Sequence, residues 1–153
     1  MKDEEDVDGH LNVVEFLLSY ETYGLESVYI GEIYPLEEYT PVPCTPPFVL
    51  GIINVRGKIL SVIDIRKFFE LPEKGLTGLN QVIILRSDKM EFGILADSIT
   101  GVRRIPAREV QPSLPTLTGL RADYLKGVTK EGLVILDADK ILSDPGIIVH
   151  EEA

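Results

Sequence analysis

The chain contains an internal repeat, and this repeat limits the possible folds more than any other feature of the sequence. Four pairs of matching residues are each separated by 69 positions: Gly24 and Gly93, Ile30 and Ile99, Ile33 and Val102, and Pro43 and Pro112. Two further features recur at a larger spacing: Gly51 with Gly127, and Asp64-x-x-Lys67-Phe68 with Asp137-x-x-Lys140-Ile141. Because two copies are too few for a solenoid, the sequence predicts one structural unit that has been duplicated.

The composition of each copy favours short strands. Val, Ile and Leu dominate the apolar residues, and the 13 Gly and 10 Pro favour turns over helices. We expect a turn at 20–24, short helical turns at 66–70, 106–109 and 137–142, and strands at 11–18, 25–33, 48–53, 59–65, 81–85, 91–102, 124–128 and 133–136. Each copy then has the size of a small five-stranded barrel.

The predicted fold class is therefore all-β with minor helix: two five-stranded β-barrels packed side by side. We expect an acidic N-terminal tail at 1–11, a domain at 12–142 and a C-terminal tail at 143–153. Within the domain, the repeat halves span about 12–71 and 80–142 and form two interlocked barrel subdomains. A shared apolar seam should join them, because units of this size bury too little apolar surface alone.

Charge and cysteine content exclude several partners and compartments. The net charge of −10 argues against nucleic acid and anionic membrane surfaces, which are polyanionic. No apolar run approaches the roughly 20 residues of a membrane span, and the acidic N-terminus does not resemble a secretory signal. A single cysteine, Cys44, cannot form an internal disulfide, so we expect a cytoplasmic protein without direct membrane insertion.

The sequence offers little to an enzyme. The two histidines, His10 and His150, lie near the ends of the chain, and no glycine loop with the spacing of a phosphate-binding motif precedes a helix. Four aspartates could in principle form an acid/base pair or bind a metal: Asp64, Asp97, Asp137 and Asp139. However, Asp64 and Asp137 occupy equivalent positions just before short helical turns, which favours helix capping. We expect no catalytic activity, no cofactor and no metal site.

The segment 43–69 carries the best candidate for a functional residue. Two apolar strands flank Asn54-Val55-Arg56-Gly57, a pattern typical of a β-hairpin. Gly51, Asn54, Gly57 and Asp64 are interpreted as structural. Arg56 is not required by the turn, and the second copy has Lys130-Glu131-Gly132 at this place. Arg56 is either a solvated hairpin tip or an anchor at a protein interface, where arginine is common.

Equivalent strand positions suggest a second part of the same site. Ile30, Ile33, Ile99 and Val102 lie late on matching strands. They either belong to the core or line an open seam between the two copies. An open apolar seam of this kind would accept an amphipathic helix.

The motifs of the segment 43–69, together with two stretches of the second copy, resemble those of the CheW-like domain family of chemotaxis coupling proteins. The matching stretches are Pro43-Cys44-Thr45-Pro46-Pro47-Phe48, Gly51-Ile52-Ile53-Asn54-Val55-Arg56-Gly57, Val62-Ile63-Asp64-Ile65, Gly93-Ile94-Leu95-Ala96-Asp97 and Tyr124-Leu125-Lys126-Gly127. Val55 replaces the usual Leu and Ser61 a usual Pro. The resemblance covers about 13–142 and implies two SH3-like barrels without catalytic activity.

The resemblance also implies partners and a site. Members of this family bridge the cytoplasmic tips of chemoreceptors to the histidine kinase CheA, which has its own CheW-like regulatory domain, and are recruited to membrane-associated receptor arrays. The implied receptor-binding residues are Arg56, Ile30, Glu32, Ile99 and Val102, with Glu32 able to pair with Arg56. The implied kinase-binding residues lie in the loop after the second strand pair: Gln111, Leu114 and Leu117. An adaptor in another receptor–kinase pathway, such as surface motility or second-messenger control, is the alternative.

Overall fold

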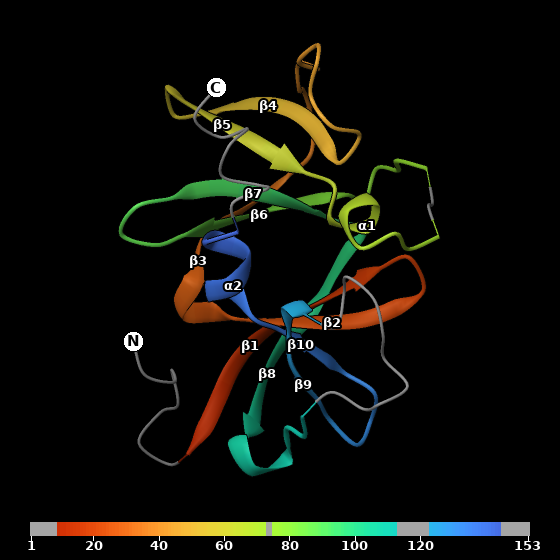
Figure 1. Ribbon diagram of the computed structural model, residues 1–153, viewed down its shortest axis with the longest axis vertical. Coiled ribbons are helices and arrows are strands. Elements are labelled where there is room, and N and C mark those ends of the chain that lie inside the picture. Colours follow the sequence, from red (N-terminus) through yellow and green to blue (C-terminus); the bar gives the residue numbers. More distant parts are fainter. Residues whose placement is uncertain (1–8, 73–74, 113–122, 145–153) are drawn as a thin grey trace.

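The computed structural model describes residues 9–72, 75–112 and 123–144, which form two five-stranded sheets and a few short helices (Figure 1). The strands are β1 (His10–Leu18), β2 (Glu21–Glu26), β3 (Ile30–Pro35), β4 (Val49–Val55), β5 (Lys58–Ile63), β6 (Gln81–Arg86), β7 (Glu91–Ala96), β8 (Ser98–Pro106), β9 (Leu125–Val128) and β10 (Val134–Leu136). The helices are α1 (Ile65–Phe68), α2 (Ala138–Leu142) and the 3-10 turns η1 (Ser27–Tyr29) and η2 (Ala107–Glu109). The prediction of an all-β fold with minor helix is confirmed.

Each sheet contains strands of both sequence copies. Sheet A has the order β8-β1-β2-β10-β9, and sheet B has the order β3-β6-β7-β5-β4. Replacing each strand by its counterpart in the other copy (β1 by β6, β2 by β7, and so on) converts the order of sheet A into that of sheet B. The hairpin β1–β2 of the first copy thus completes sheet A with three strands of the second copy. The hairpin β6–β7 of the second copy likewise completes sheet B with three strands of the first copy. A copy therefore does not form a barrel alone, which corrects the expectation of one barrel-sized unit per copy.

The strand registers confirm the repeat. Val14 of β1 lies opposite Val102 of β8, and Ile83 of β6 lies opposite Ile33 of β3. These are the same pairing shifted by 69 positions. Each of the two pairings also contains a register shift at the same equivalent place. The duplication therefore extends from the sequence to individual strand contacts.

Two long strands predicted from the sequence are each two strands in the structure. The run 25–33 is divided by η1 into β2 and β3, and the run 91–102 is divided at Asp97 into β7 and β8. At each break the chain leaves one sheet and enters the other. The two polar residues at each break, Glu26-Ser27 and Asp97-Ser98, were not a sufficient signal, because apolar residues resume after them. The predicted turn at 20–24 has the wrong bounds: the turn lies at Ser19 and Tyr20, and residues 21–24 belong to β2, where Tyr23 is fully buried.

One glycine in each sheet, Gly51 in sheet B and Gly127 in sheet A, allows the sheet to curl. A Cβ atom on Gly51 would lie 2.5 Å from the carbonyl oxygen of Thr40, and one on Gly127 would lie 2.3 Å from that of Gln111. Thr40, after β3, forms an isolated bridge with β4, and Gln111, after β8, forms one with β9. These bridges bring together the two edges of each sheet. The match between Gly51 and Gly127 in the sequence therefore reflects the same close backbone approach.

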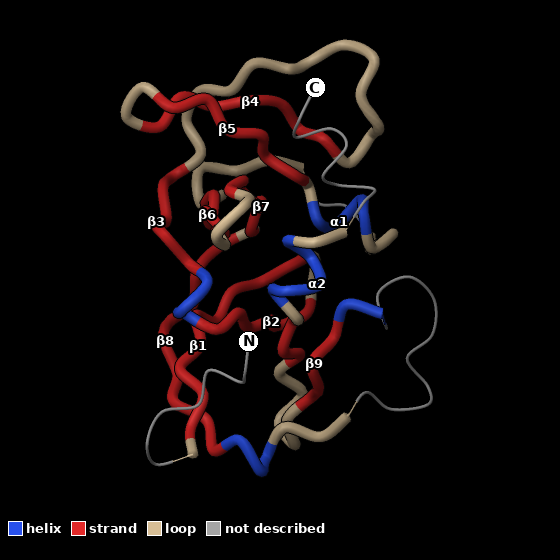
Figure 2. The backbone as a smooth tube through the Cα atoms, turned by 60° about the vertical axis from the view of Figure 1, so that its left-hand side comes forward, coloured by secondary structure: helices blue, strands red, loops and turns tan. Residues whose placement is uncertain are grey.

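The main apolar core joins the two sheets, as the predicted seam requires. It contains residues of both sheets and of α1 and α2, among them Phe16, Tyr23, Ile83 and Phe92. Two smaller clusters each fill the interior of one sheet. Figure 2 shows sheet B above sheet A with both α-helices beside the junction. Among the described residues, no helix is long and apolar enough to span a membrane.

We expect Gly127→Ala to lower the free energy of unfolding by about 1–3 kcal/mol, because the added methyl group would overlap the backbone of Gln111. Urea unfolding followed by circular dichroism measures this change. Gly78→Ala is the control, since a Cβ atom there meets nothing within 4 Å. Equal stability of the two variants would contradict the close-approach role of Gly127.

Candidate functional site: the β4–β5 turn and the edge strands

Arg56 lies at a central position of the β4–β5 turn. Val55 pairs with Lys58, so the turn has only Arg56 and Gly57 between the strands. Both have positive φ, 54° and 84°, the pattern of a type I′ hairpin turn. The Asn54 side chain accepts a hydrogen bond of 2.8 Å from the Gly57 backbone N–H. Arg56 is thus part of the turn, contrary to the sequence interpretation, and sits in a backbone conformation that costs a non-glycine residue about 1–2 kcal/mol.

The Arg56 side chain pairs with Glu32 on β3. The guanidinium Nη2 lies 2.8 Å from Glu32 Oε2, while the two side chains are 77% and 37% exposed. Tyr34 donates a hydrogen bond from its hydroxyl to the other oxygen, Oε1. This bond to Glu32 raises the pKa of Tyr34, and the nearby Arg56 charge partly opposes the shift. The expected pairing of Glu32 with Arg56 is present, and Tyr34 is a third member that the sequence interpretation missed.

The second copy makes the same connection without strain at a side-chain-bearing residue. Its hairpin places three residues, Lys130 to Gly132, between Thr129 and Leu133. The only positive φ in that stretch, 92°, belongs to Gly132. The Thr129 side chain accepts a hydrogen bond of 3.1 Å from the Leu133 N–H. The fold can therefore build the equivalent hairpin without an arginine, so the hairpin itself does not require Arg56.

A surface depression of about 550 Å³ lies beside Arg56. Its walls come from the end of β3 and the residues after it, and from the β4–β5 hairpin; they include Tyr34, Leu36, Asn54 and Val55. Glu37 and Glu38 also line it. The depression therefore offers a mixed polar and apolar surface next to an exposed cation.

The other predicted receptor-binding residues lie on the edge strands of the two sheets. Ile30 and Glu32 are on β3, and Ile99 and Val102 are on β8. Ile30 and Ile99 are half-buried against the main core, so the core interpretation holds for part of each side chain. Val102 is 75% exposed, an unusually open position for a large aliphatic side chain.

Of the predicted kinase-binding residues, only Gln111 lies within the described residues. It is exposed and forms the bridge to Val128 that closes sheet A. Leu114 and Leu117 lie outside the described residues.

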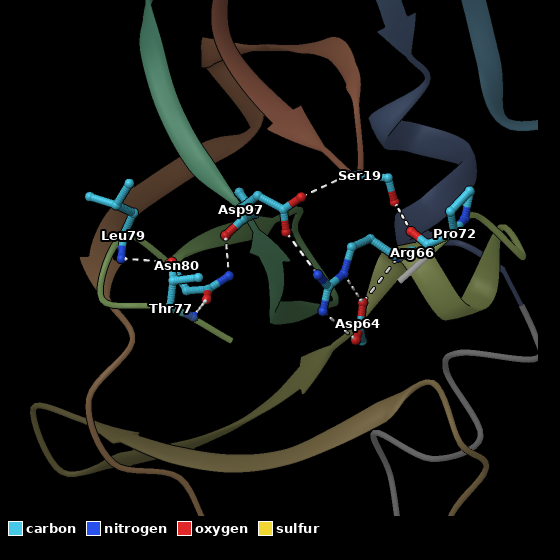
Figure 3. A network of polar contacts seen from close by, with 9 residues as sticks. Ser19, Asp64, Arg66, Pro72, Thr77, Leu79, Asn80 and Asp97 are labelled. Carbon is cyan, nitrogen blue, oxygen red and sulfur yellow. Dashed lines mark hydrogen bonds and ion pairs between the residues drawn. The ribbon is translucent and has the colours of Figure 1, made fainter. Parts of the chain in front are cut away.

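The aspartates weighed as catalytic or metal-binding groups have structural partners. The side chains of Asp64 and Asp137 accept backbone hydrogen bonds at the starts of α1 and α2, which confirms helix capping. Asp64 and Asp97 flank the buried Arg66 guanidinium at 3.0 and 2.9 Å (Figure 3). Asp97 also accepts a 2.6 Å bond from the Ser19 N–H. In the part of the chain that the structure describes, no group of three His, Cys, Asp or Glu side chains is arranged to hold a metal.

Comparison with known proteins identifies the family of the chain. The family model described as "CheW-like domain" matches residues 12–146. The chain belongs to the CheW-like family. A "Chemotaxis protein CheW" from Treponema pallidum (strain Nichols) is 33% identical over 89% of this chain and 84% of the relative. "Protein FrzA" from Myxococcus xanthus is 30% identical over 78% and 77% of the two chains.

A solved structure supports the fold of this CheW-like domain. The scaffolding protein TtCheW from Thermoanaerobacter tengcongensis matches with a TM-score of 0.80 and 27% identity, over 95% of both chains. The predicted pair of SH3-like subdomains is therefore confirmed at the level of the family fold.

Replacing Arg66 tests the buried ionic cluster. We expect Arg66→Met to lower the free energy of unfolding by about 3–5 kcal/mol, because it leaves the Asp64 and Asp97 carboxylates buried without their cation. Lys67→Met removes the same charge from the exposed side of α1 and should have a much smaller effect. Chemical denaturation of both variants gives the comparison, and a similar loss in the two would contradict the proposed role of Arg66.

Replacing Arg56 tests whether the turn depends on the arginine side chain. We expect Arg56→Asn to leave the free energy of unfolding unchanged or to raise it by up to about 1 kcal/mol, since Asn tolerates positive φ. Arg56→Val should destabilise the protein, because a β-branched residue tolerates this conformation poorly. A clear loss of stability in Arg56→Asn would show that the fold needs the Arg56–Glu32 pair.

Proposed function

We propose that the protein is a non-catalytic chemotaxis adaptor that couples the cytoplasmic tips of chemoreceptors to the histidine kinase CheA. Membership of the CheW-like family supports this role, as do relatives named as chemotaxis proteins and a structural relative described as a scaffolding protein. The observation that carries the proposal for this chain is Arg56, an exposed cation held by Glu32 at a strained turn that the second copy builds without an arginine.

In this proposal the receptor tip contacts residues from both sheets. Arg56 and Glu32 supply polar contacts on the side of sheet B, and Val102 supplies an exposed apolar side chain on β8 of sheet A. Ile30 and Ile99 complete the surface with their exposed portions. Burying one such aliphatic side chain contributes about 1.5–3 kcal/mol, and micromolar affinity needs about 8 kcal/mol. A few contacts of this kind therefore suffice for reversible binding.

The kinase binds a different part of the surface in this proposal. We assign Gln111, Leu114 and Leu117 to contact with the CheW-like regulatory domain of CheA. Gln111 is exposed at the closed edge of sheet A and so is accessible to a partner. Simultaneous binding of both partners would recruit this cytoplasmic adaptor to receptor arrays at the membrane.

An adaptor in another receptor–kinase pathway is the second candidate. One relative at 30% identity carries the name FrzA rather than a chemotaxis designation, so membership of the family does not by itself specify the pathway. The same contacts would then serve a different receptor and kinase. Identification of the proteins that co-purify with the chain from its own cytoplasm distinguishes the two pathways.

Charge reversal at Arg56 tests the receptor site. We expect Arg56→Glu to weaken binding to a purified chemoreceptor cytoplasmic fragment by about 30-fold or more, because a carboxylate would replace the cation beside Glu32. Isothermal titration calorimetry measures the affinity, and circular dichroism checks that the fold is intact.

Lys130→Glu is the matched control for Arg56→Glu. It makes the same change of net charge at the equivalent hairpin of the second copy, on an exposed residue. We expect nearly unchanged receptor affinity in this variant. Wild-type affinity in Arg56→Glu, or an equal loss in both variants, would contradict the assignment of the site.

A further inference from the structure

The interlocked fold has a competitor that the repeat itself creates. Because the copies are equivalent, β1–β2 could in principle pair with β3, β4 and β5 of its own copy instead of β8, β9 and β10 of the other. Backbone hydrogen bonding would be the same in both arrangements. We call the observed arrangement exchanged and the alternative self-closed. Only side chains that differ between the copies can distinguish them.

The first such difference lies inside the sheets. Glu26 of β2 is 2% exposed and pairs with Lys126 of β9 at 2.7 Å. Its counterpart 69 positions later is Leu95, which is fully buried, and the residue that matches Lys126 next to the Gly51/Gly127 pair is Leu50. Leu95 and Leu50 pack in the same apolar cluster inside sheet B.

The exchanged arrangement thus places charge against charge and leucine against leucine. In the self-closed arrangement Glu26 would face Leu50, and Leu95 would face Lys126. The second carboxylate oxygen of Glu26 is already buried without a hydrogen-bond partner among the described residues. Loss of Lys126 would therefore leave the whole carboxylate buried and unpaired, which is strongly unfavourable.

A second pair follows the same rule. Arg103 of β8 lies 3.4 Å from Glu15 of β1, and these strands come from different copies. Their counterparts 69 positions away are Tyr34 and Ile84, which pack together in the cluster inside sheet B. Self-closure would place Tyr34 beside Glu15, which would lose its cation, while Arg103 would keep its 2.6 Å contact with Glu131 of its own copy.

The buried cluster of Figure 3 supplies a third pair. Arg66 of the first copy bonds Asp97 of the second at 2.9 Å. By the spacing that relates Asp64 to Asp137, Arg66 corresponds to Asp139, and Asp97 corresponds to Val28. In the self-closed arrangement Asp139 would meet Asp97, so two carboxylates would oppose each other. Arg66 would keep Asp64 of its own copy but would meet Val28 in place of Asp97.

We infer that these three ion pairs specify which hairpin completes which sheet: Glu26–Lys126, Glu15–Arg103 and Arg66–Asp97. Each pair joins residues of different copies, and each is mismatched in the self-closed arrangement. A buried ion pair contributes little net stability compared with an apolar pair, but leaving the buried carboxylate of Glu26 or Asp97 without its cation is costly. The Glu15–Arg103 pair is partly exposed and contributes less to the discrimination. The ion pairs therefore act against the alternative fold. This inference is independent of the proposed adaptor function.

Two variants with the same overall amino-acid composition as the wild type test the rule. Leu50→Lys with Lys126→Leu creates a mismatch in both sheets of the exchanged arrangement, while matching the self-closed one. Adding Glu26→Leu and Leu95→Glu moves the ion pair into sheet B and restores the match in both sheets. We expect the twofold variant to raise the unfolding equilibrium constant roughly 100-fold or more over wild type. The fourfold variant carries more substitutions, yet its unfolding equilibrium constant should be at least roughly tenfold lower than that of the twofold variant.

Urea unfolding gives the equilibrium constants, and nuclear Overhauser contacts between Val14 and Val102 report the β1–β8 pairing of the exchanged fold. Wild type and the fourfold variant should show these contacts, and the twofold variant should show them weakened or lost. If the twofold variant does not fold while the fourfold variant does, the rule is supported in its strongest form. A fourfold variant no more stable than the twofold variant, or a twofold variant as stable as wild type that keeps the Val14–Val102 contacts, would overturn it.

Discussion

The exchange of strands between the two sequence copies is the constraint on which the rest of the structure depends. Neither copy completes a five-stranded sheet alone, because the hairpins β1–β2 and β6–β7 each extend the other copy's sheet. The two chain segments that change sheets, at η1 and at Asp97, consequently lie where the sheets meet. The largest apolar cluster spans the same junction and contains residues of both sheets. Unfolding of either sheet must therefore disturb the other, so the two subdomains are expected to be one cooperative unit.

Local contacts explain how a strained turn can persist at the surface. Arg56 adopts a positive φ that an arginine rarely takes, and the hairpin holds it there through the pairing of Val55 with Lys58 and the Asn54 side chain. Glu32, on a strand fixed by its pairing with β6, holds the guanidinium from the other side, and the Tyr34 hydroxyl donates a hydrogen bond to Glu32. A cation that is oriented before a partner arrives loses less conformational freedom on binding than a mobile one.

Much of the fold could be predicted from the sequence, because the repeat and the apolar patterns are local or countable signals. The all-β class, the hairpin at Arg56, the helix caps at Asp64 and Asp137, and the equivalence of Gly51 and Gly127 were all accessible in this way. The strand exchange was not, because hydrogen bonding is identical for exchanged and self-closed copies and pattern alone does not reveal the partner strand.

The site was predictable to a similar degree. The Arg56–Glu32 pair was expected only from the family resemblance, because β3 and β4 are opposite edges of sheet B and the strand pattern alone does not bring them together. Tyr34 was missed, although its spacing of two from Glu32 places both on the same face of a strand. The positive φ of Arg56 could not be predicted, because Asn54 and Gly57 suggested a turn centred one residue earlier. The burial of Arg66 was also hidden, since its partner Asp97 is distant in sequence and its counterpart Asp139 has the opposite charge.

In a duplicated fold, each residue can be compared with its counterpart in the other copy. The differences between the copies are of two kinds, at buried positions and at exposed positions. Where the copies differ at buried positions, as at Glu26 and Leu95, the difference acts on which strands pair. Where the copies differ at exposed positions, as at Arg56, the difference does not act on which strands pair. The free-energy cost of the positive φ at Arg56 must then be offset by the stability of the rest of the fold. Val102 fits the second kind, because its counterpart Ile33 packs against the core while Val102 itself is open to solvent. The symmetric frame thus accounts for the shared residues, and the exposed asymmetric residues Arg56 and Val102 are the ones to which we assign recognition of a partner in the proposed function.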